Sequence, residues 1–341
     1  MSTNGTPLLE VRSLQVQFFT RGGTAHAVRD VSFSIQPGET LGLVGESGSG
    51  KSVTAFSILG LIQLPGRITG GDVRWKGESL LGDAGERRLQ RIRGKELAVV
   101  FQDPMTSLNP LFTVEKQIGE VLRLHRGMSR GEAHERVAEL LDLVGIPSPR
   151  AKAKAYPHEL SGGQRQRVMI AMALAGEPEL LIADEPTTAL DVTIQAQILE
   201  LIAELQQQLG LAVLLITHDL GVVAEVSSRV AMMYGGKIME TGTAFDLFER
   251  PGHPYTKGLL SSTPRLDIVL PRLVGIEGVP PDLITPPVGC PFEARCPIRI
   301  DRCVDEMPPL ERHEQGREVA CWRAFDILDS EFAGRVERQR L

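Results

Sequence analysis

The sequence lacks any long apolar run. Among its 341 residues, no apolar stretch approaches the roughly 18 residues that a membrane-spanning helix needs. Residues 1–7 contain neither the basic start nor the apolar segment of a secretory signal. We therefore expect a cytosolic protein that would reach a membrane only through a partner.

The chain also lacks an excess of basic residues, and cysteine is scarce. Its formal net charge is −6, whereas proteins that bind nucleic acid usually have a basic face. The four cysteines all lie between Cys290 and Cys321. In a reducing compartment, such a group is more often a metal site than a set of disulfides.

The apolar pattern predicts an α/β core that is interrupted by a helical insert. Most of the first hundred residues are typical of strands and turns, and short buried strands are expected at 40–44, 180–183 and 213–216. Apolar residues recur at helical spacing between them, so the helical insert is assigned to about 103–176. Proline becomes dense after Arg250, which predicts two domains, 1–250 and 251–341.

A glycine-rich loop follows the first of these buried strands. Residues 45–52, GESGSGKS, fit the pattern G-x-x-x-x-G-K-[ST], and an apolar helix is expected to follow from Val53. Glycines let the backbone N–H groups of such a loop face phosphate oxygens. Lys51 would contact the β- and γ-phosphates, and the Ser52 hydroxyl would bind Mg²⁺. Only one such loop is present, so we expect one nucleotide module.

Polar residues that suit ATP hydrolysis follow three of the predicted strands. Asp184 and Glu185 end the strand 180–183, where Asp184 suits Mg²⁺ and Glu185 can act as general base on the attacking water. Gln102 follows another strand and can contact Mg²⁺ or that water. His218 follows the strand 213–216 and can hydrogen-bond the γ-phosphate. Taken alone, a glutamine such as Gln102 is usually a surface residue, and a lone histidine such as His218 is at least as often structural as functional.

In this order, the segments resemble the ATP-binding cassette (ABC) ATPases over residues 8–250. The likeness rests on the phosphate loop (Walker A), the Gln102 loop, the signature LSGGQ at 160–164, the strand end 180–185 (Walker B), the D-loop 189–191 and His218. It implies a P-loop fold with a RecA-like core, an antiparallel β subdomain and an inserted helical subdomain. It also implies an ATPase with Glu185, His218 and Gln102 as catalytic residues.

The signature segment implies a second subunit. Ser161, Gly162 and Gly163 precede a helix that we expect to start near Gln164, whose N-terminus would form an anion site. In the ABC family this segment closes on ATP held by another subunit, which implies a dimer. Phe18 lies where the family often has a tyrosine that stacks on adenine, although a core role is the alternative. We expect nucleotide contacts from Phe18, Gly45, Glu46, Ser47, Gly48, Ser49, Gly50, Lys51, Ser52, Val53, Asp191, and, in the partner's site, Ser161, Gly162, Gly163 and Gln164.

The C-terminal region resembles the extension of oligopeptide and dipeptide importer ATPases. The likeness rests on 253–260, 278–283 and 289–292, and the segments 101–110 and 156–161 fit the same subfamily. It implies a subunit that hydrolyses ATP to drive di- or oligopeptide uptake at the cytoplasmic face of the bacterial inner membrane. Implied partners are a second, non-identical ABC ATPase, two transmembrane permease subunits that dock near 103–124, and an extracytoplasmic substrate-binding protein, with no nucleic acid.

Other substrates and another class of ATPase remain as alternatives. Importers of nickel, glutathione or oligosaccharides share the same subfamily. An ABC ATPase that acts on nucleic acid is the remaining alternative, although neither a long coiled coil nor a second cassette is visible.

The four cysteines are spaced C-x5-C-x6-C-x17-C, at Cys290, Cys296, Cys303 and Cys321. Thiolates suit iron–sulfur clusters or zinc, but structural zinc sites usually contain close pairs of cysteines, which are absent here. The spacing therefore favours a cluster, and the importer subfamily that the chain resembles carries a [4Fe–4S] cluster at such cysteines. Zinc, or reduced thiols without metal, are the alternatives.

Overall fold

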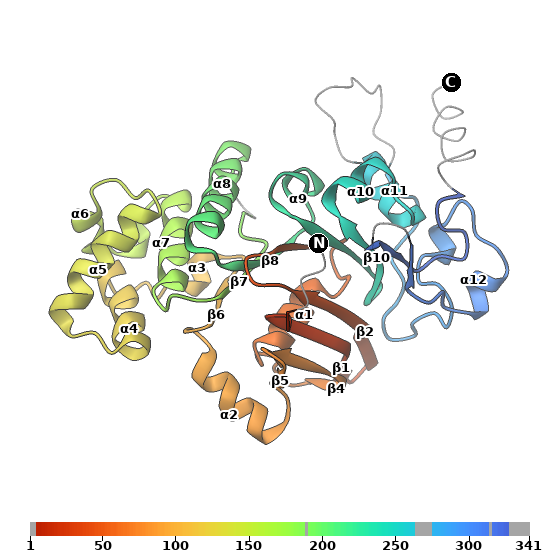
Figure 1. Cartoon of the computed structure of the whole chain (residues 1–341), viewed down its shortest axis with the longest axis horizontal. Helices are drawn as coiled ribbons and strands as arrows, with labels where there is room; N and C mark the ends of the chain where they lie inside the picture. The colour runs from red at the N-terminus through yellow and green to blue at the C-terminus, as the bar shows by residue number, and fades with distance from the viewer. Residues whose placement is uncertain (1–4, 188–189, 263–274, 314–315, 327–341) are drawn as a thin grey trace. The chain divides into compact units, whose positions relative to one another are not determined.

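The computed structural model describes residues 5–187, 190–262, 275–313 and 316–326 (Figure 1). These residues fall into two compact units. The first unit contains the described residues of 5–8, 35–40 and 75–216, and the second contains 9–34, 41–74 and the described residues from 217 onward. Both units mix helices with strands, so the α/β class is as predicted.

The first unit is built on a parallel sheet with the strand order β8-β7-β6. Its strands are β6 (Leu97–Val100), β7 (Leu180–Asp184) and β8 (Ala212–Thr217). Leu97 pairs with Leu180, which in turn pairs with Ala212. All residues of β7 and β8 are buried, as expected of parallel strands that are covered on both faces.

The helices of the first unit lie mostly between β6 and β7 in the sequence, as the predicted helical insert requires. Those that follow β6 are α3 (Pro104–Ser107), α4 (Val114–Arg126), α5 (Arg130–Leu143), α6 (Pro149–Ala153), η1 (Pro157–Glu159) and α7 (Gly162–Leu174), and α8 (Val192–Leu209) comes after β7. Their ends follow capping rules: Ser129 and Glu132 form a capping box on α5, and Gly210 ends α8 with a positive φ.

One helix contradicts the prediction that the first hundred residues are mainly strands and turns. After β5 (Glu78–Ser79), α2 spans Gly82–Ile92 and buries only Gly85, Leu89 and Ile92. Its two glycines and its many charged residues resemble a loop in the sequence, and its two buried apolar side chains are too few to show a helical period.

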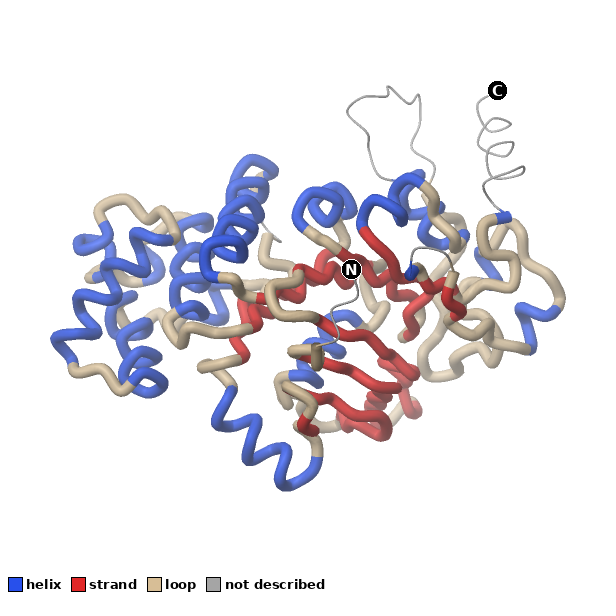
Figure 2. The backbone as a smooth tube through the Cα atoms, viewed as in Figure 1, coloured by secondary structure: helices blue, strands red, loops and turns tan. Residues whose placement is uncertain are grey.

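The second unit contains two sheets, drawn in red in Figure 2. One has the order β2-β1-β4, formed by β1 (Leu9–Thr20), β2 (Gly23–Ile35) and β4 (Gly66–Trp75). The other has the order β11-β12-β10-β9-β3, formed by β3 (Thr40–Val44), β9 (Arg229–Tyr234), β10 (Lys237–Thr243), β11 (Glu311–Arg312) and β12 (Glu318–Val319). In this second sheet β3 runs parallel to β9, whereas the pairs β9·β10, β10·β12 and β12·β11 are antiparallel.

The C-terminal region contributes to the core of the second unit. The helices of the second unit are α1 (Lys51–Ile58), α9 (Leu220–Val226), α10 (Ala244–Glu249), α11 (Pro254–Ser262), η2 (Glu293–Arg295) and α12 (Arg302–Asp305). Tyr255, Cys290 and Phe292 pack in one apolar cluster with Val44, the last residue of β3. Strand β12 extends the sheet by pairing Val319 with Glu240 of β10.

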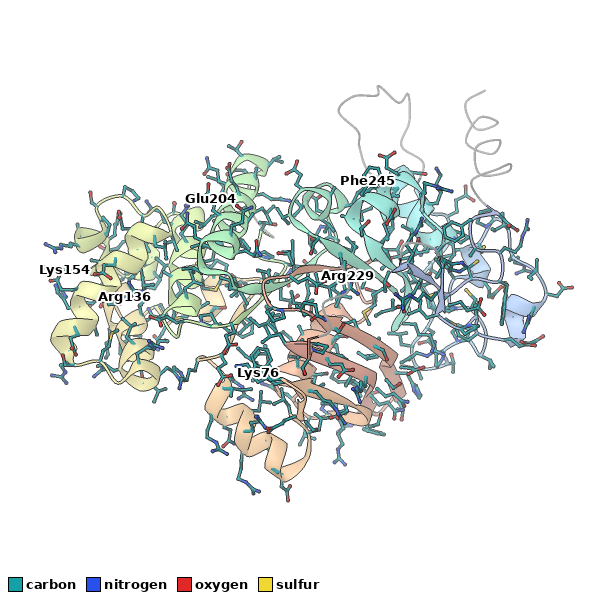
Figure 3. All side chains as sticks on the ribbon, in the orientation of Figure 1. Lys76, Arg136, Lys154, Glu204, Arg229 and Phe245 are labelled. Carbon is teal, nitrogen blue, oxygen red and sulfur yellow. The ribbon has the colours of Figure 1, made fainter. Side chains whose placement is uncertain are left out.

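Several apolar side chains of the described residues are exposed, among them Phe245 of α10, which is 75% exposed (Figure 3). Isolated exposed apolar residues of this kind are ordinary. In the part of the chain that the structure describes, no helix is both long and apolar enough to span a bilayer.

Candidate nucleotide-binding and hydrolysis site

The glycine-rich loop joins β3 to α1, as the sequence predicts. A Cβ on Gly45 would lie 2.0 Å from the carbonyl oxygen of Met233, and one on Gly50 would lie 2.4 Å from that of Ala27. Gly50 also has a φ of 105°, which L-residues rarely adopt. The loop can therefore take this path only with glycine at both positions.

The loop has the chemistry of an anion site. Lys51 is buried and its Nζ donates to the carbonyl oxygens of Gly45 at 2.7 Å and Glu46 at 3.0 Å. The Ser49 hydroxyl is buried without a hydrogen-bond partner among the described residues. A buried hydroxyl beside a lysine is a ready donor to a phosphate oxygen, so the residues present fit a nucleotide. Ser52, a predicted Mg²⁺ ligand, and Val53 are half-buried in the first turn of α1.

Phe18 lies on β1, where it is half-buried. A Cβ added to Gly66 would come within 2.6 Å of the ring, so the ring lies over the backbone of β4. Both the adenine-stacking prediction and the core alternative are compatible with this position.

Gln102 and Glu185 meet at the carboxyl ends of neighbouring strands. Because β6 and β7 are parallel and Val100 pairs with Ala183, the residues that follow them emerge at the same edge of the sheet. Gln102 Nε2 donates to Glu185 Oε2 at 3.1 Å. An amide that contacts a carboxylate in this way can orient it toward a water molecule.

The backbone at Glu185 is strained. Its φ is 45°, in the left-handed region that costs a non-glycine residue about 1–2 kcal/mol. Its N–H donates to the carbonyl oxygen of Ile216 at 2.9 Å, which holds the residue in this conformation. Asp184, the predicted Mg²⁺ ligand that precedes it, is only 3% exposed. Strain of this kind is typical of functional sites.

His218 belongs to the second unit and follows the end of β8. Its imidazole is exposed. Asp219 caps α9 by accepting the N–H of Gly221 at 2.9 Å, and its own N–H donates to Thr217 Oγ1 at 3.0 Å. These bonds fix the backbone on either side of the histidine.

The signature segment forms a capped helix start. Helix α7 begins at Gly162, two residues earlier than predicted, because Ser161 is its N-cap. Ser161 Oγ accepts the N–H of Gln164, and Gln164 Oε1 accepts the N–H of Ser161, both at 3.3 Å. The pattern S-x-x-Q at residues 161–164 is the sequence signal of this capping box. Ser161 is exposed, which leaves this helix N-terminus accessible to an anion.

Two small contacts shape the surroundings of this helix start. A Cβ on Gly163 would lie 2.8 Å from Ile194 Cγ2, so only glycine fits there without displacing that side chain. Asp191 caps α8 by accepting the N–H of Ile194 at 3.0 Å. Ala189 of the predicted D-loop lies outside the described residues.

The four cysteines of the C-terminal region line one cavity of about 10 Å³. All four are free thiols, and burial raises the pKa of Cys290 to about 12, of Cys296 to about 11 and of Cys321 to about 12. As they are arranged, no group of three or more His, Cys, Asp or Glu side chains among the described residues could hold a metal ion. The predicted cluster ligands therefore gather at one place without forming a metal site.

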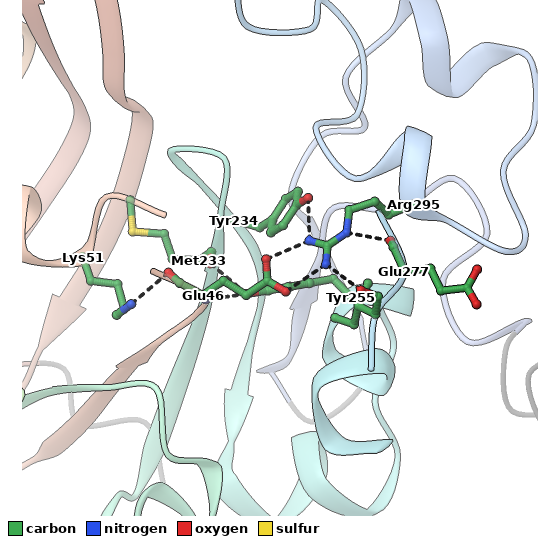
Figure 4. Close-up of polar contacts among 8 residues, drawn as sticks. Glu46, Lys51, Met233, Tyr234, Tyr255, Glu277 and Arg295 are labelled. Atoms are coloured by element: carbon green, nitrogen blue, oxygen red, sulfur yellow. Dashed lines mark hydrogen bonds and ion pairs between the residues drawn. The ribbon is translucent and has the colours of Figure 1, made fainter. Parts of the chain in front are cut away.

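Two residues to which the sequence gave no role contact the phosphate loop (Figure 4). Arg295 forms an ion pair with the Glu46 carboxylate, and the Tyr255 hydroxyl accepts the Glu46 N–H at 2.8 Å. More than two hundred positions separate each of them from Glu46. In the sequence, Arg295 precedes Cys296, a predicted ligand, and Tyr255 lies in the segment 253–260 that resembles the importer extension.

Comparison with known families gives two matches along the chain. Residues 28–188 match the ABC transporter family, and residues 239–303 match the oligopeptide/dipeptide transporter C-terminal region.

Similar proteins and structures cover most of the sequence. The chain is 53% identical to the dipeptide transport ATP-binding protein DppD of Bacillus subtilis, over 92% of this chain and 94% of that protein. It is 51% identical to the oligopeptide transport ATP-binding protein OppD of Salmonella typhimurium, over 94% and 95% respectively. Among solved structures, a dimeric post-hydrolysis state of the ATP-binding cassette MJ0796 bound to ADP and Pi aligns with a TM-score of 0.61. That alignment has 30% identity and covers 69% of this chain and 98% of that chain.

Proposed function

This chain belongs to the ABC transporter family, and we propose that it hydrolyses ATP as a subunit of a bacterial importer of dipeptides or oligopeptides. The observation that carries this proposal is the likeness, over nine-tenths of the chain, to two ATP-binding proteins of dipeptide and oligopeptide transport. The match of the C-terminal region to peptide transporters supports the same substrate class.

The proposed roles follow the chemistry of each residue. Lys51 and the loop around it would bind the phosphates, and Glu185 would accept a proton from the attacking water. Gln102 supports the second role because it contacts the Glu185 carboxylate. His218 would donate a hydrogen bond to the γ-phosphate.

Mg²⁺ and a second subunit complete the proposed site. Hydroxyl, carboxylate and amide oxygens suit Mg²⁺, and Ser52, Asp184 and Gln102 would provide them. When bound, the ion neutralises charge on the phosphates. The exposed start of α7, at Ser161, would contact ATP held by a second ABC subunit, which we propose to be non-identical.

The remaining partners would be two membrane permease subunits and an extracytoplasmic substrate-binding protein. No helix of the described residues can span a bilayer, so the chain would associate with the cytoplasmic face of the membrane through the permease.

We also propose that the four cysteines bind a [4Fe–4S] cluster. Two observations support this: the four cysteines line one cavity, and all four are free thiols. In their present arrangement they could not hold a metal ion, and the cavity fits about one water molecule. Binding would thus require the thiols to turn and separate. Anaerobic purification should give a brown protein that contains iron and sulfide. A colourless protein with stoichiometric zinc would contradict the proposal.

Co-purification tests the proposed function. Affinity purification of the full chain in mild detergent should recover two membrane permease subunits and a second ABC ATPase. Recovery of the chain alone, with ATPase activity that is stimulated by DNA or RNA, would contradict the transport function.

A further inference from the structure

Arg295 holds Glu46 of the phosphate loop in a two-pronged ion pair. Its Nη1 lies 2.7 Å from Glu46 Oε2 and its Nη2 lies 3.1 Å from Oε1 (Figure 4). The other donors bind the Tyr234 hydroxyl and the carbonyl oxygens of Ile276 and Glu277, each at 3.0 Å. The side chain of Arg295 is 6% exposed, so the guanidinium is fixed on several sides.

Tyr255 fixes the backbone of the same loop residue. Its hydroxyl accepts the Glu46 N–H at 2.8 Å and donates to the Met233 carbonyl oxygen at 3.5 Å. Burial raises the pKa of Tyr255, so the hydroxyl keeps its proton and can make both bonds. The loop N–H of Glu46 therefore binds Tyr255 in this structure, although the sequence pattern assigned it to phosphate.

The charge of Glu46 matters because the loop is suited to an anion. Glu46 follows Gly45 directly, and the buried Lys51 amine contacts the carbonyl oxygens of both residues. An unpaired, partly buried carboxylate at this place would repel a polyphosphate. The guanidinium of arginine stays charged in proteins, so Arg295 compensates the Glu46 charge through this ion pair.

We propose that Arg295 is a positioning residue for the nucleotide site that acts through Glu46, with Tyr255 in support. Arg295 neutralises a carboxylate beside the phosphates and fixes the loop that binds them. It has this role only if the chain binds ATP as proposed above. Because Arg295 lies between Cys290 and Cys296, the segment that carries two of the four cysteines would then also support the ATP site.

Replacement of Arg295 by methionine in the full-length chain tests this. Equilibrium titration with a fluorescent ATP analogue should show binding weakened by about tenfold to a hundredfold, since an unpaired, partly buried charge remains. Steady-state hydrolysis should show a higher KM for ATP and a kcat changed by less than about threefold, because the pair does not contact the reacting atoms. Arg299→Met removes an exposed ion pair of the same region and should leave both values unchanged.

A double-mutant cycle separates this role from a merely structural one. In a Glu46→Gln background no carboxylate repels the phosphates, so Arg295→Met should weaken ATP binding by less than about twofold, the usual limit of additivity. If Arg295 acts only by holding the carbonyl oxygens of Ile276 and Glu277, Arg295→Met should weaken ATP binding by the same factor with and without Glu46→Gln. Arg295→Lys keeps the charge but loses the fork, so its affinity should lie between those of the parent and Arg295→Met.

Two results would overturn the inference. One is unchanged ATP affinity in Arg295→Met, or in Arg295→Lys if the methionine variant does not fold. The other is an equal loss of affinity with and without Glu46→Gln. Lys51→Ala keeps this test distinct from the proposed function. If Lys51→Ala binds ATP as the parent does, the nucleotide site itself is wrong; if it does not, the Arg295 result decides the inference alone.

Discussion

Replacement of Glu185 by glutamine changes one oxygen of the proposed general base into an amide. Glutamine has the same length, and its carbonyl oxygen can still accept the hydrogen bond that Gln102 Nε2 donates at 3.1 Å. The φ of 45° is equally strained for both side chains. Loss of charge at this exposed hydrogen bond should cost about 1 kcal/mol of stability. The variant should therefore fold and bind ATP.

The rate of ATP hydrolysis by Glu185→Gln should fall far more than its stability. Loss of a well-placed general base typically lowers a rate by about 10²–10⁴-fold, or roughly 3–5 kcal/mol in activation free energy. Phosphate release at saturating ATP measures the rate, and titration with ATP measures the affinity. With hydrolysis blocked, ATP should also hold the variant in a closed dimer, which size-exclusion chromatography detects.

Glu185→Gly is the matched control for strain. Glycine adopts a φ of 45° without strain, so this variant should unfold at no lower temperature than Glu185→Gln, yet it should be equally inactive. Full ATPase activity in Glu185→Gln, or a rate within about tenfold of the parent, would refute the assignment of Glu185 as general base.

Two further substitutions test the fold around the site. Gly45→Ala places a Cβ 2.0 Å from the Met233 carbonyl oxygen, so it should abolish ATP binding in a titration and lower the melting temperature. Arg317→Met leaves Glu240, which is fully buried, without its cation and should cost about 3 kcal/mol in urea unfolding, whereas Arg150→Met at an exposed pair should cost less than about 1 kcal/mol. Burial raises the pKa of Glu240, so Glu240 binds a proton more tightly in the folded variant than in the unfolded chain. The loss of stability in Arg317→Met should therefore be larger at neutral pH than at acidic pH.

Local patterns in the sequence predicted the elements that carry the phosphate loop. The strand 40–44 matches β3, and the helix expected from Val53 is α1, which begins two residues earlier at Lys51. Both are continuous or strongly periodic apolar segments, so burial alone determines them. Gln102 and Glu185 each follow a predicted strand. Because these two strands are parallel neighbours in the sheet, the two residues emerge at the same edge and can make contact.

Contacts between distant segments could not be predicted in this way. The ion pair of Arg295 with Glu46 depends on a loop that returns to the phosphate loop, and no periodicity records that return. The cysteine spacing predicted the ligands of a cluster, and the four side chains line one cavity. It could not predict the rotamers that decide whether the thiols hold a metal, because these depend on the packing of Phe292 and His253 around the cavity.

The central claim is that ATP hydrolysis by this chain drives peptide import. The most direct test measures accumulation of a labelled di- or oligopeptide in proteoliposomes that contain the complex purified with this chain and its substrate-binding protein. ATP should drive accumulation of the peptide when the complex contains the parent chain. No peptide should accumulate when it contains Lys51→Ala. Peptide accumulation that is equal with both chains, or absent with the parent while its ATPase is active, would contradict the claim.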